Sequence, residues 1–445
     1  MKTPIVDFVR EYAASKTERC HMPGHKGQAL LGCEPLDITE IEGADVLYSP
    51  TGIIRESEEN AARLFGASHT IYSTQGSTLC IQAMVGAVCQ RAERKGERPL
   101  LLAARNVHRA FVSACALFDA DVRWLFPKEG DGLLRCTVTP DEVEQALSAS
   151  QKTPVAVYLT SPDYLGNAAD VEGIARVCNA HGVPLLVDNA HGAYLRFLSP
   201  SRHPINLGAA MCCDSAHKTL PVLTGGAYLH VSPVGEAYLD AARSALSLLA
   251  STSPSYLILQ SLDLCNRLLS EEFPRTLVDF AKRVQKTRER LTDKGWSFVG
   301  DEGLKLTVAA THCGYTGVEL GAQLREAGFE PELCDGEHVV LMLSPQNGEA
   351  LLPKLEDFLQ ALPKKAPLTA AEPKLAKGER VLSIREACLA PRECVPVSEA
   401  EGRISATVTA SCPPAVPIAV SGERITRDMI DLFLHYGVNT VEVVK

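Results

Sequence analysis

Residues 155–192 read VAVYLTSPDYLGNAADVEGIARVCNAHGVPLLVDNAHG, and this stretch decides the fold class. Residues 155–159 and 185–187 are apolar at every position, which is typical of central parallel strands buried on both faces. The segment 171–181 between them has a helical pattern, and Gly182 follows it as a C-cap. A strand, a helix and a second strand in this order predict an α/β domain with a largely parallel sheet.

The same alternation extends on both sides of this stretch. Thr139 and Pro140 open a helix with a cap, a proline at the first position and acids in the first turn. After Gly226 the pattern becomes more helical. The other expected elements are strands at residues 70–72, 100–104 and 122–126 and helices at residues 78–91, 108–118 and 274–294.

The chain is predicted to divide into four parts. Residues 1–50 lack a sustained hydrophobic period and contain many turns, which indicates an arm or lid, and residues 51–285 form a large domain. Residues 286–364 form a small α/β domain. A linker rich in proline, lysine and alanine begins near residue 363, and residues 365–445 are predicted as a separate α/β module.

The composition is that of a globular protein with an acidic balance. The chain has 445 residues, 46% hydrophobic and 22% charged, which is ample for a large buried core. Its 44 basic and 54 acidic side chains give a formal charge of −10 at pH 7, which argues against nucleic acid as a partner. The acidity is compatible with attracting cationic small molecules, or it serves solubility alone.

The chain contains 15 cysteines, but no pair has the C-x-x-C spacing of a zinc or redox site. The N-terminal segment lacks the apolar core of a signal peptide, and no run approaches the roughly 20 apolar residues of a membrane span. We therefore expect a reduced, cytoplasmic protein with no metal site and no membrane contact, whose cysteines are mostly small buried side chains.

Ligands of open α/β sheets bind beyond the carboxyl ends of the strands, so the residues there are the candidates for a site. Residues 73–78, STQGST, follow the strand at 70–72 and lead into a helix. A glycine and hydroxyls at a helix N-terminus offer backbone N–H groups and the positive end of the helix dipole to a phosphate. The alternative is an ordinary N-cap without a ligand.

Two more candidates follow strands. His108 comes shortly after the strand at 100–104, and it either faces a ligand or merely neighbours a helix N-cap. Asp188 follows the strand at 185–187, where a carboxylate must be hydrogen-bonded or paired because an isolated buried charge is costly. The alternative for Asp188 is a loop-capping role.

Lys218 lies in residues 214–219, DSAHKT, between two apolar stretches. A buried lysine has a lowered pKa and can form an imine with a carbonyl, whereas a surface lysine only extends its stem over apolar residues. A phosphate cradle, the His108 ring, the Asp188 carboxylate and a later lysine are together the parts of a pyridoxal phosphate (PLP) site. In such a site the lysine holds the cofactor as a Schiff base, and the acid keeps the pyridine nitrogen protonated.

With these residues in place, the sequence resembles the Orn/Lys/Arg decarboxylases of the short type, in the aspartate aminotransferase-like superfamily of PLP enzymes. The resemblance runs nearly end to end. It implies fold type I: a PLP-binding large domain with a mainly parallel sheet, a smaller α/β domain and a C-terminal α/β module. The matching motifs are residues 21–27 (HMPGHKG), 37–40 (DITE), 45–52 (DVLYSPTG), 105–109 (RNVHR), 161–166 (SPDYLG), 188–192 (DNAHG) and 215–220 (SAHKTL).

The resemblance implies a role for each matching residue. Lys218 would bind the cofactor, and Asp188 would face the pyridine nitrogen. His108 and Ala190 would lie against the two faces of the ring, and either His217 or Lys218 would supply a proton. The implied catalytic residues are Lys218, His217, His108 and Asp188, and the implied cofactor-binding residues are Gly76, Ser77, Thr78, His108, Asp188, Ala190, His191, Ser215, His217 and Lys218.

The sequence departs from the family's pattern in three places. Cys412 and Ala415 stand where a C-terminal motif usually has tyrosine and glycine, in a region that lies near the substrate's end of the site in this family. Residues 75–78, QGST, replace an NGTT- or NGST-like run, and Asn189 stands where glutamate is common. The first of these changes bears on substrate specificity rather than on the cofactor.

The implied function is PLP-dependent decarboxylation of a basic amino acid, namely arginine, lysine or ornithine. Glu399, Glu401 and Glu423 are candidates for binding the cationic end of such a substrate. The alternatives are transamination or elimination on the same fold, and a non-catalytic homologue that binds PLP. In fold relatives, an arm such as the one that holds His25 and Lys26 completes the site of the partner subunit, so a homodimer or larger homo-oligomer is expected by analogy.

Overall fold

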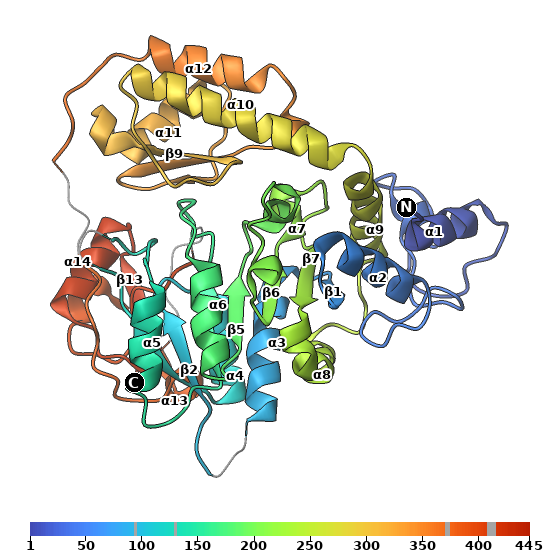
Figure 1. Cartoon of the computed structure of the whole chain (residues 1–445), viewed down its shortest axis with the longest axis horizontal. Helices are drawn as coiled ribbons and strands as arrows, with labels where there is room; N and C mark the ends of the chain where they lie inside the picture. The colour runs from blue at the N-terminus through green and yellow to red at the C-terminus, as the bar shows by residue number, and fades with distance from the viewer. Residues whose placement is uncertain (93–95, 129–130, 370–373, 407–414) are drawn as a thin grey trace.

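The computed structural model describes residues 1–92, 96–128, 131–369, 374–406 and 415–445. Its centre is a seven-stranded sheet with the strand order β1-β7-β6-β5-β4-β2-β3 (Figure 1). Neighbouring strands pair in parallel except at β7, which is antiparallel to both β1 and β6. The strands are β1 (His69–Ser73), β2 (Leu100–Ala104), β3 (Asp121–Leu125), β4 (Ala156–Thr160), β5 (Leu185–Asp188), β6 (Met211–Asp214) and β7 (Ala227–Val231).

Helices cover both faces of this sheet, as expected for parallel strands that are apolar throughout. One face packs against α3 (Gly76–Arg91), α4 (Arg109–Phe118) and α8 (Leu239–Leu249), and the other against α5 (Pro140–Ser148) and α6 (Val171–Ala180). The expected helix start at Thr139 is confirmed, since Thr139 and Glu142 form a capping box that opens α5, and Gly182 follows α6 with a φ of 66°. The α/β class with a largely parallel sheet is confirmed.

The structure differs from the sequence prediction at β7. The pattern after Gly226 predicts mainly helices, yet the next five residues form a strand that is buried at every position. A short strand of this kind carries neither the period of a helix nor the alternation of a half-buried strand, which explains why the pattern does not reveal it.

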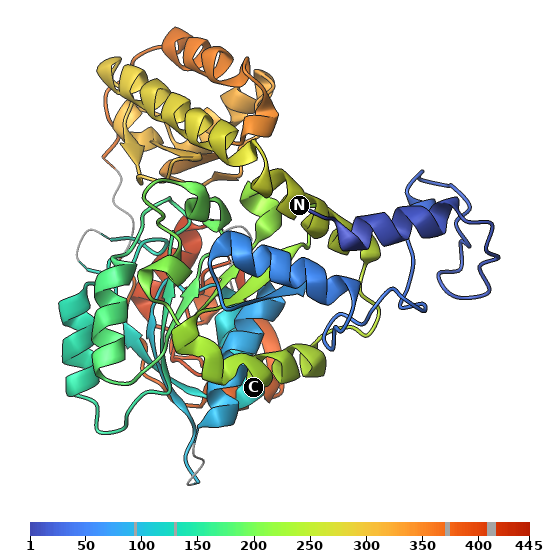
Figure 2. The same cartoon turned by 45° about the vertical axis from the view of Figure 1, so that its right-hand side comes forward.

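The first fifty residues also differ from the predicted arm or lid, because they contain a helix that the sequence does not predict. Helix α1 (Pro4–Ala14) packs in the core beside α9 (Tyr256–Ser270). The Oδ2 atom of Asp263 in α9 accepts hydrogen bonds from the backbone N–H groups of Ile5 and Val6, at 2.9 and 3.0 Å. The helix is therefore capped by a tertiary contact, and the segment that follows it projects from the body of the protein (Figure 2).

A second, antiparallel sheet with the order β10-β11-β9-β8 lies in the small unit, where side chains of three helices pack with it in one core. The C-terminal unit holds a two-stranded sheet. The predicted boundary after residue 285 falls within α10, and the domain limits stay predictions. The elements are α10 (Phe273–Asp293), β8 (Phe298–Val299), β9 (Lys305–Ala309), α11 (Gly317–Glu326), β10 (Leu333–Cys334), β11 (His338–Met342), α12 (Leu351–Ala361), α13 (Ile384–Leu389), β12 (Arg392–Pro396), α14 (Arg427–His435) and β13 (Thr440–Val444).

Both smaller units are anchored where the central strands end. Arg105, which follows β2, is buried and donates to the carbonyl groups of Pro417 and Ile418 at 2.7 and 2.9 Å. The Thr307 hydroxyl of β9 donates to the carbonyl of Leu165, after β4, at 2.8 Å. These contacts place the small domain and the C-terminal module beside the strand-end candidates.

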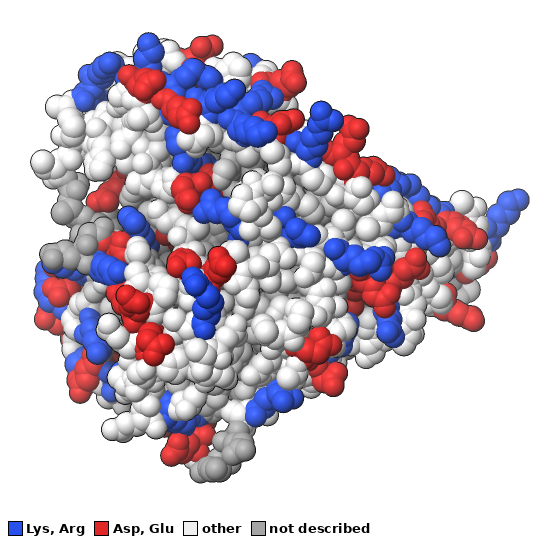
Figure 3. Space-filling model, viewed as in Figure 1, with Lys and Arg blue, Asp and Glu red and all other residues white. Residues whose placement is uncertain are grey.

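The surface and the cysteines add two observations. Acidic and basic side chains are interspersed on the face that Figure 3 shows, with basic side chains of α10 gathered along its upper edge. The described cysteines are free thiols and most are buried, as the sequence predicts. Of the helices in the described part of the chain, none has both the length and the apolar character needed to cross a membrane.

Candidate active site

A cavity of about 590 Å³ opens at the carboxyl ends of the central strands. Its lining comes from all three units, with Glu332 from the small domain and Ala415 and Val416 from the C-terminal module. A larger surface groove lies between α2 (Ile53–Phe65) and α8, and none of the predicted catalytic or cofactor-binding residues lines it. All ten residues of the predicted cofactor-binding set line the cavity: Gly76, Ser77, Thr78, His108, Asp188, Ala190, His191, Ser215, His217 and Lys218.

The start of helix α3 is open to this cavity. Gly76 has a φ of 70°, in the left-handed region that favours glycine, and a Cβ atom there would meet no atom within 4 Å. The N-cap residue Gln75 makes no side-chain capping bond, and the Ser215 hydroxyl donates to that of Ser77 at 2.8 Å. The Gly76 N–H donates to the carbonyl of Gly225 at 2.7 Å, so the N–H groups that follow it, beside the paired hydroxyls, are the ones that fit an anionic group such as a phosphate.

Asp188 is a buried carboxyl group, 2% exposed, that faces the cavity from the end of β5. It accepts from the backbone N–H of Ala190 at 3.2 Å and from the Tyr158 hydroxyl at 3.3 Å, and the Cys213 thiol lies 3.6 Å away. Burial raises the pKa of Asp188, and the positive charge of Lys218 opposes this shift. Because these three donors are neutral, a cationic group in the cavity would stabilise the ionised carboxylate.

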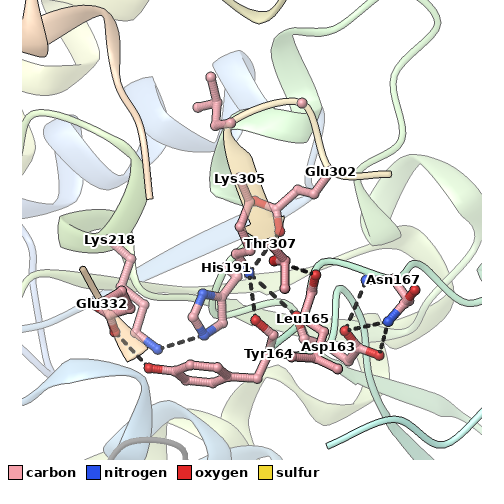
Figure 4. A network of polar contacts seen from close by, with 12 residues as sticks. Asp163, Tyr164, Leu165, Asn167, His191, Lys218, Glu302, Lys305, Thr307 and Glu332 are labelled. Carbon is pink, nitrogen blue, oxygen red and sulfur yellow. Dashed lines mark hydrogen bonds and ion pairs between the residues drawn. The ribbon is translucent and has the colours of Figure 1, made fainter. Parts of the chain in front are cut away.

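Lys218 points into the same space, with its Nζ atom 3.0 Å from Nε2 of His191 (Figure 4). Burial lowers the pKa of Lys218, while the Asp188 carboxylate opposes the shift. Burial also lowers the pKa of His191 well below its usual range, so this ring is neutral at pH 7. A lysine with a neutral partner and a lowered pKa is suited to attack a carbonyl carbon.

Two further histidines of the cavity are also held neutral. Nδ1 of His108 accepts from the backbone N–H of Ala110 at 3.1 Å, and burial and the Lys218 charge lower the pKa of His108 to about 4. Nδ1 of His217 lies 3.0 Å from the carbonyl oxygen of Gly226, which can only accept, so this nitrogen carries the proton. Burial lowers the pKa of His217, and the Nε2 atom of its neutral ring has no proton.

Glu332 is an acid of the cavity that sequence reasoning misses. The Tyr164 hydroxyl donates to Oε1 of Glu332 at 2.7 Å, and the Tyr164 ring lies edge-on to His191 with centroids 5.1 Å apart. Tyr164 belongs to the recognised 161–166 motif. Glu332 belongs to no motif, and only the packing of the small domain brings it to the cavity, so no local signal identifies it.

The three acids proposed from the sequence lie elsewhere. Glu423 is buried 3.6 Å from Arg105, and neither Glu399 nor Glu401 is among the described residues that line the cavity. Cys412 lies outside the described residues. Ala415 does line the cavity and has a φ of 57°, a conformation that favours the glycine expected at this position.

A second lysine is buried beside the site. Lys305, at the start of β9, lies 2.9 Å from the carboxylate of Glu302. Its Nζ atom donates to the backbone carbonyls of Asp163 and Tyr164, at 3.4 and 3.3 Å (Figure 4). Lys305 therefore ties the small domain to the loop that positions Tyr164.

The sheet, the helices on its two faces and the small domain define the α/β architecture known as fold type I. Constitutive lysine decarboxylase of Escherichia coli superposes with a TM-score of 0.77 at 19% identity, covering 100% of this chain and 82% of that one. Lysine decarboxylase A of Pseudomonas aeruginosa gives 0.80 at 17% identity, covering 99% and 80%. An alanine–glyoxylate aminotransferase of Nostoc gives 0.55 at 18%, covering 69% and 85%.

The chain belongs to the Orn/Lys/Arg decarboxylase family. The family's major domain matches residues 3–307, and its C-terminal domain matches residues 371–438. Among its relatives, an arginine decarboxylase of Bacillus subtilis is 29% identical over 463 residues, which cover 96% of this chain and 92% of the relative. An arginine decarboxylase of Halalkalibacterium halodurans is 30% identical over 464 residues, covering 96% and 91%.

Proposed function

We propose that this protein is a PLP-dependent decarboxylase that converts a basic amino acid to the corresponding amine and carbon dioxide. The observation that carries the proposal is the meeting of Lys218, Asp188, His108 and the uncapped start of α3 around one cavity. Membership of the family supports it, as do the arginine and lysine decarboxylases among the similar proteins.

The residues of the cavity fit PLP by their chemistry. The start of α3, with Ser77 and Ser215, would hold the phosphate, and Lys218 would bind the aldehyde carbon. Asp188 would hold a proton at the ring nitrogen, which gives its buried carboxylate the cationic partner that it lacks. When bound, PLP supplies an electron sink for the bond that breaks at the substrate's α-carbon.

We assign the proton donor to Lys218 rather than to His217. The neutral His217 ring carries its proton on Nδ1, where the carbonyl of Gly226 accepts it. The Nζ atom of Lys218 reaches the cavity, and its contact with His191 holds it in place. Lys218 would therefore deliver a proton to the α-carbon after carbon dioxide has left.

Glu332 is the proposed partner of the substrate's cationic end. It lines the cavity, and the Tyr164 hydroxyl orients its carboxylate. A carboxylate binds a guanidinium through paired hydrogen bonds and an ammonium as a point charge, which suits arginine, lysine and ornithine. We expect Glu332→Gln to lower kcat/KM for the preferred substrate about 10- to 100-fold, mainly through KM. Unchanged KM values would remove Glu332 from this role.

We further propose a cytoplasmic homodimer. His25 lies 3.3 Å from Asp37, and Lys26 bonds to the carbonyl of His21, so these motif residues contact one another within the projecting arm rather than the cavity of their own chain. An arm of this kind can complete the site of a partner subunit. The free thiols of the described cysteines support a reducing compartment. Sedimentation at micromolar concentration tests the assembly, and a monomer with full activity would contradict it.

The decisive experiment measures cofactor and product together. The purified protein should show the visible absorption band of a lysine-bound cofactor, which borohydride abolishes and Lys218→Ala lacks. Carbon dioxide release is then measured from arginine, lysine and ornithine, with leucine as the uncharged control. Keto acid in place of carbon dioxide would favour transamination. A bound cofactor without turnover of any amino acid would favour a non-catalytic homologue.

A further inference from the structure

A fully buried polar cluster joins the two strand ends that carry the reactive groups. Asp214, the last residue of β6, is 0% exposed and directly precedes Ser215. Its Oδ2 atom accepts hydrogen bonds from Nε2 of His203 at 2.9 Å and from Nε2 of His230 at 3.1 Å. Its Oδ1 atom accepts from the side-chain amide of Asn189 at 2.6 Å. One carboxylate thus receives three side-chain donors from three different segments.

The partners of the cluster are themselves held in place. The Thr70 hydroxyl lies 2.8 Å from Nδ1 of His230, and the Phe65 ring packs against both histidine rings, with centroids 5.4 and 4.4 Å away. Burial alone would raise the pKa of Asp214, but His203 and His230 together lower it below its usual range, so the carboxylate is ionised at pH 7. The Asp214 carboxylate is hydrogen-bonded at both oxygens, whereas Nδ1 of His203 and Oδ1 of Asn189 have no partner among the described residues. Hydrogen bonds that converge on one buried charge fix its geometry more strictly than apolar packing does.

The positions of Asn189 and Asp214 make this geometry relevant to the site. Asn189 directly follows Asp188 and comes two residues before His191, which contacts Lys218. Its backbone N–H also donates to the carbonyl of Cys213 at 3.0 Å, next to Asp214. Asp214 begins the turn that leads through His217 to Lys218. The contact between Asn189 and Asp214 therefore ties the loop after β5 to the loop after β6.

We propose that Asp214 is a positioning residue, which, with His203 and His230 as its supports, sets the distance and orientation of Lys218 relative to Asp188 and His191. The proposal rests on the proposed function, since it assigns Lys218 and Asp188 to the reaction. Asp214 touches neither the cavity nor the substrate and acts only through the two loops. The sequence shows an aspartate before the SAHKTL motif, but it gives no sign of the two distant histidines.

The same three side chains also have the composition of a metal site, since one ligand atom from each lies within 4.8 Å of the others. The directions of the contacts favour hydrogen bonds. Both Nε2 atoms approach one carboxylate oxygen, at 2.9 and 3.1 Å, which are ordinary hydrogen-bond lengths and leave that oxygen between the two rings. In a zinc site, each ligand nitrogen would instead point at the metal ion, at about 2.0–2.1 Å, and not at a carboxylate oxygen.

The test exchanges acid and amide across the contact. Asp214→Asn removes the charge and sets two amides against each other, whereas Asp214→Asn combined with Asn189→Asp restores an acid–amide pair. In the full-length holoenzyme, we expect the single variant to lower kcat about 10- to 100-fold with KM within about twofold, because small misplacements of reacting groups are costly. The pH midpoint of the visible cofactor band should also shift. The double variant should recover kcat to within about fivefold of the wild type.

Two further measurements keep the test decisive if Asp214→Asn does not fold. His203→Gln keeps an N–H near the Nε2 position and should retain the pH midpoint of the band, whereas His203→Leu should shift it. His181→Gln is the matched control, because His181 forms a surface pair with Glu144 at 2.9 Å. The rate of Lys218 acylation, followed by mass spectrometry in the full chain after cofactor removal, reports on the lysine without decarboxylation.

The outcomes separate this proposal from the proposed function. The acylation rate of Lys218 should change in Asp214→Asn and recover in the double variant. This result would support positioning even if the wild type proves not to be a decarboxylase. An active wild type whose Asp214→Asn variant loses thermal stability alone, with an unchanged band, would overturn positioning. So would a double variant no better than the single one. A stoichiometric metal that is lost in His203→Leu would overturn the hydrogen-bonded cluster itself.

Discussion

Lys218 and Lys305 lie in one polar network but have opposite surroundings (Figure 4). Lys305 is 1% exposed and ion-paired with Glu302 at 2.9 Å, and two backbone carbonyls accept its remaining hydrogen bonds. Lys218 contacts the neutral His191, and burial lowers its pKa. Among the described residues, no carboxylate forms an ion pair with Lys218. The partner of the buried amine, rather than burial as such, therefore separates a reactive lysine from a structural one.

Substitution of the reactive lysine is expected to have the largest effect on activity. Lys218→Ala should lower kcat at least about a thousandfold, because it removes both the group that binds the cofactor and the proposed proton donor. Its free energy of unfolding should change little, since Lys218 forms no ion pair with the described residues and acts on the Asp188 carboxylate only through its charge. Steady-state kinetics and urea unfolding check the two expectations, with the surface variant Lys282→Ala as the control. Retention of more than a tenth of the activity would contradict the assignment of Lys218.

Lys305→Met should show the reverse behaviour. It leaves Glu302 buried without its partner, which we expect to lower the free energy of unfolding by about 3–5 kcal/mol. Adding Glu302→Leu removes the orphaned charge and should recover most of this loss. Urea unfolding at pH 7 measures both variants. If the double variant were no more stable than the single one, the ion pair would not be the reason that Lys305 is buried.

The sequence makes one of these lysines predictable and hides the other. The carboxyl ends of parallel strands meet at one edge of a sheet, so residues 73–78, His108 and Asp188 can be placed together from the predicted strands. Lys218 joins them through its place between two apolar stretches and through the family motif at residues 215–220. Lys305 and Glu332 reach the site only through the packing of the small domain, which leaves no local pattern.

Helix α1 shows the same limit in the fold. Its N-terminal N–H groups are capped by Asp263, more than two hundred residues away, instead of by a neighbouring side chain. The capping box of α5, in contrast, lies within four consecutive residues, and the sequence predicts that helix start correctly. Features built from neighbouring residues can thus be predicted, whereas features completed by distant ones need the structure.

The pKa of His108 should respond to the charge of Lys218 but not to that of Lys305. The ordinary His108 pKa of 6.5 falls to about 4 in the folded protein, through burial and the charges of Lys218 and Arg109, so folding favours the neutral ring. The resulting stability is complete above pH 6.5 and is lost as the pH falls from 6.5 toward 4, by at most about 3 kcal/mol. Lys218→Met should raise the pKa of His108 and make this loss smaller, whereas Lys305→Met should leave it unchanged.

NMR titration of the His108 ring and urea unfolding at pH 7, 5.5 and 4 measure the two quantities. His108→Phe provides the control, because it removes the titration and keeps a ring at the position. It also removes the cap on Ala110, which should cost about 1 kcal/mol at every pH. An equal change in the pKa of His108 in both lysine variants would mean that Lys305 acts on the site electrostatically as strongly as Lys218 does.

The smallest expected effect is that of Thr307→Val, two residues after Lys305. The buried Thr307 hydroxyl donates to the carbonyl of Leu165 at 2.8 Å, and its loss leaves that carbonyl unpaired in the interior. We expect the free energy of unfolding to fall by about 1–2 kcal/mol and kcat to stay within about twofold. Urea unfolding measures the first quantity, and steady-state kinetics of the same variant measure the second. If kcat fell tenfold with stability unchanged, β9 would affect catalysis through the Tyr164 loop. Lys305 would then have a role in catalysis, like Lys218, and not only in stability.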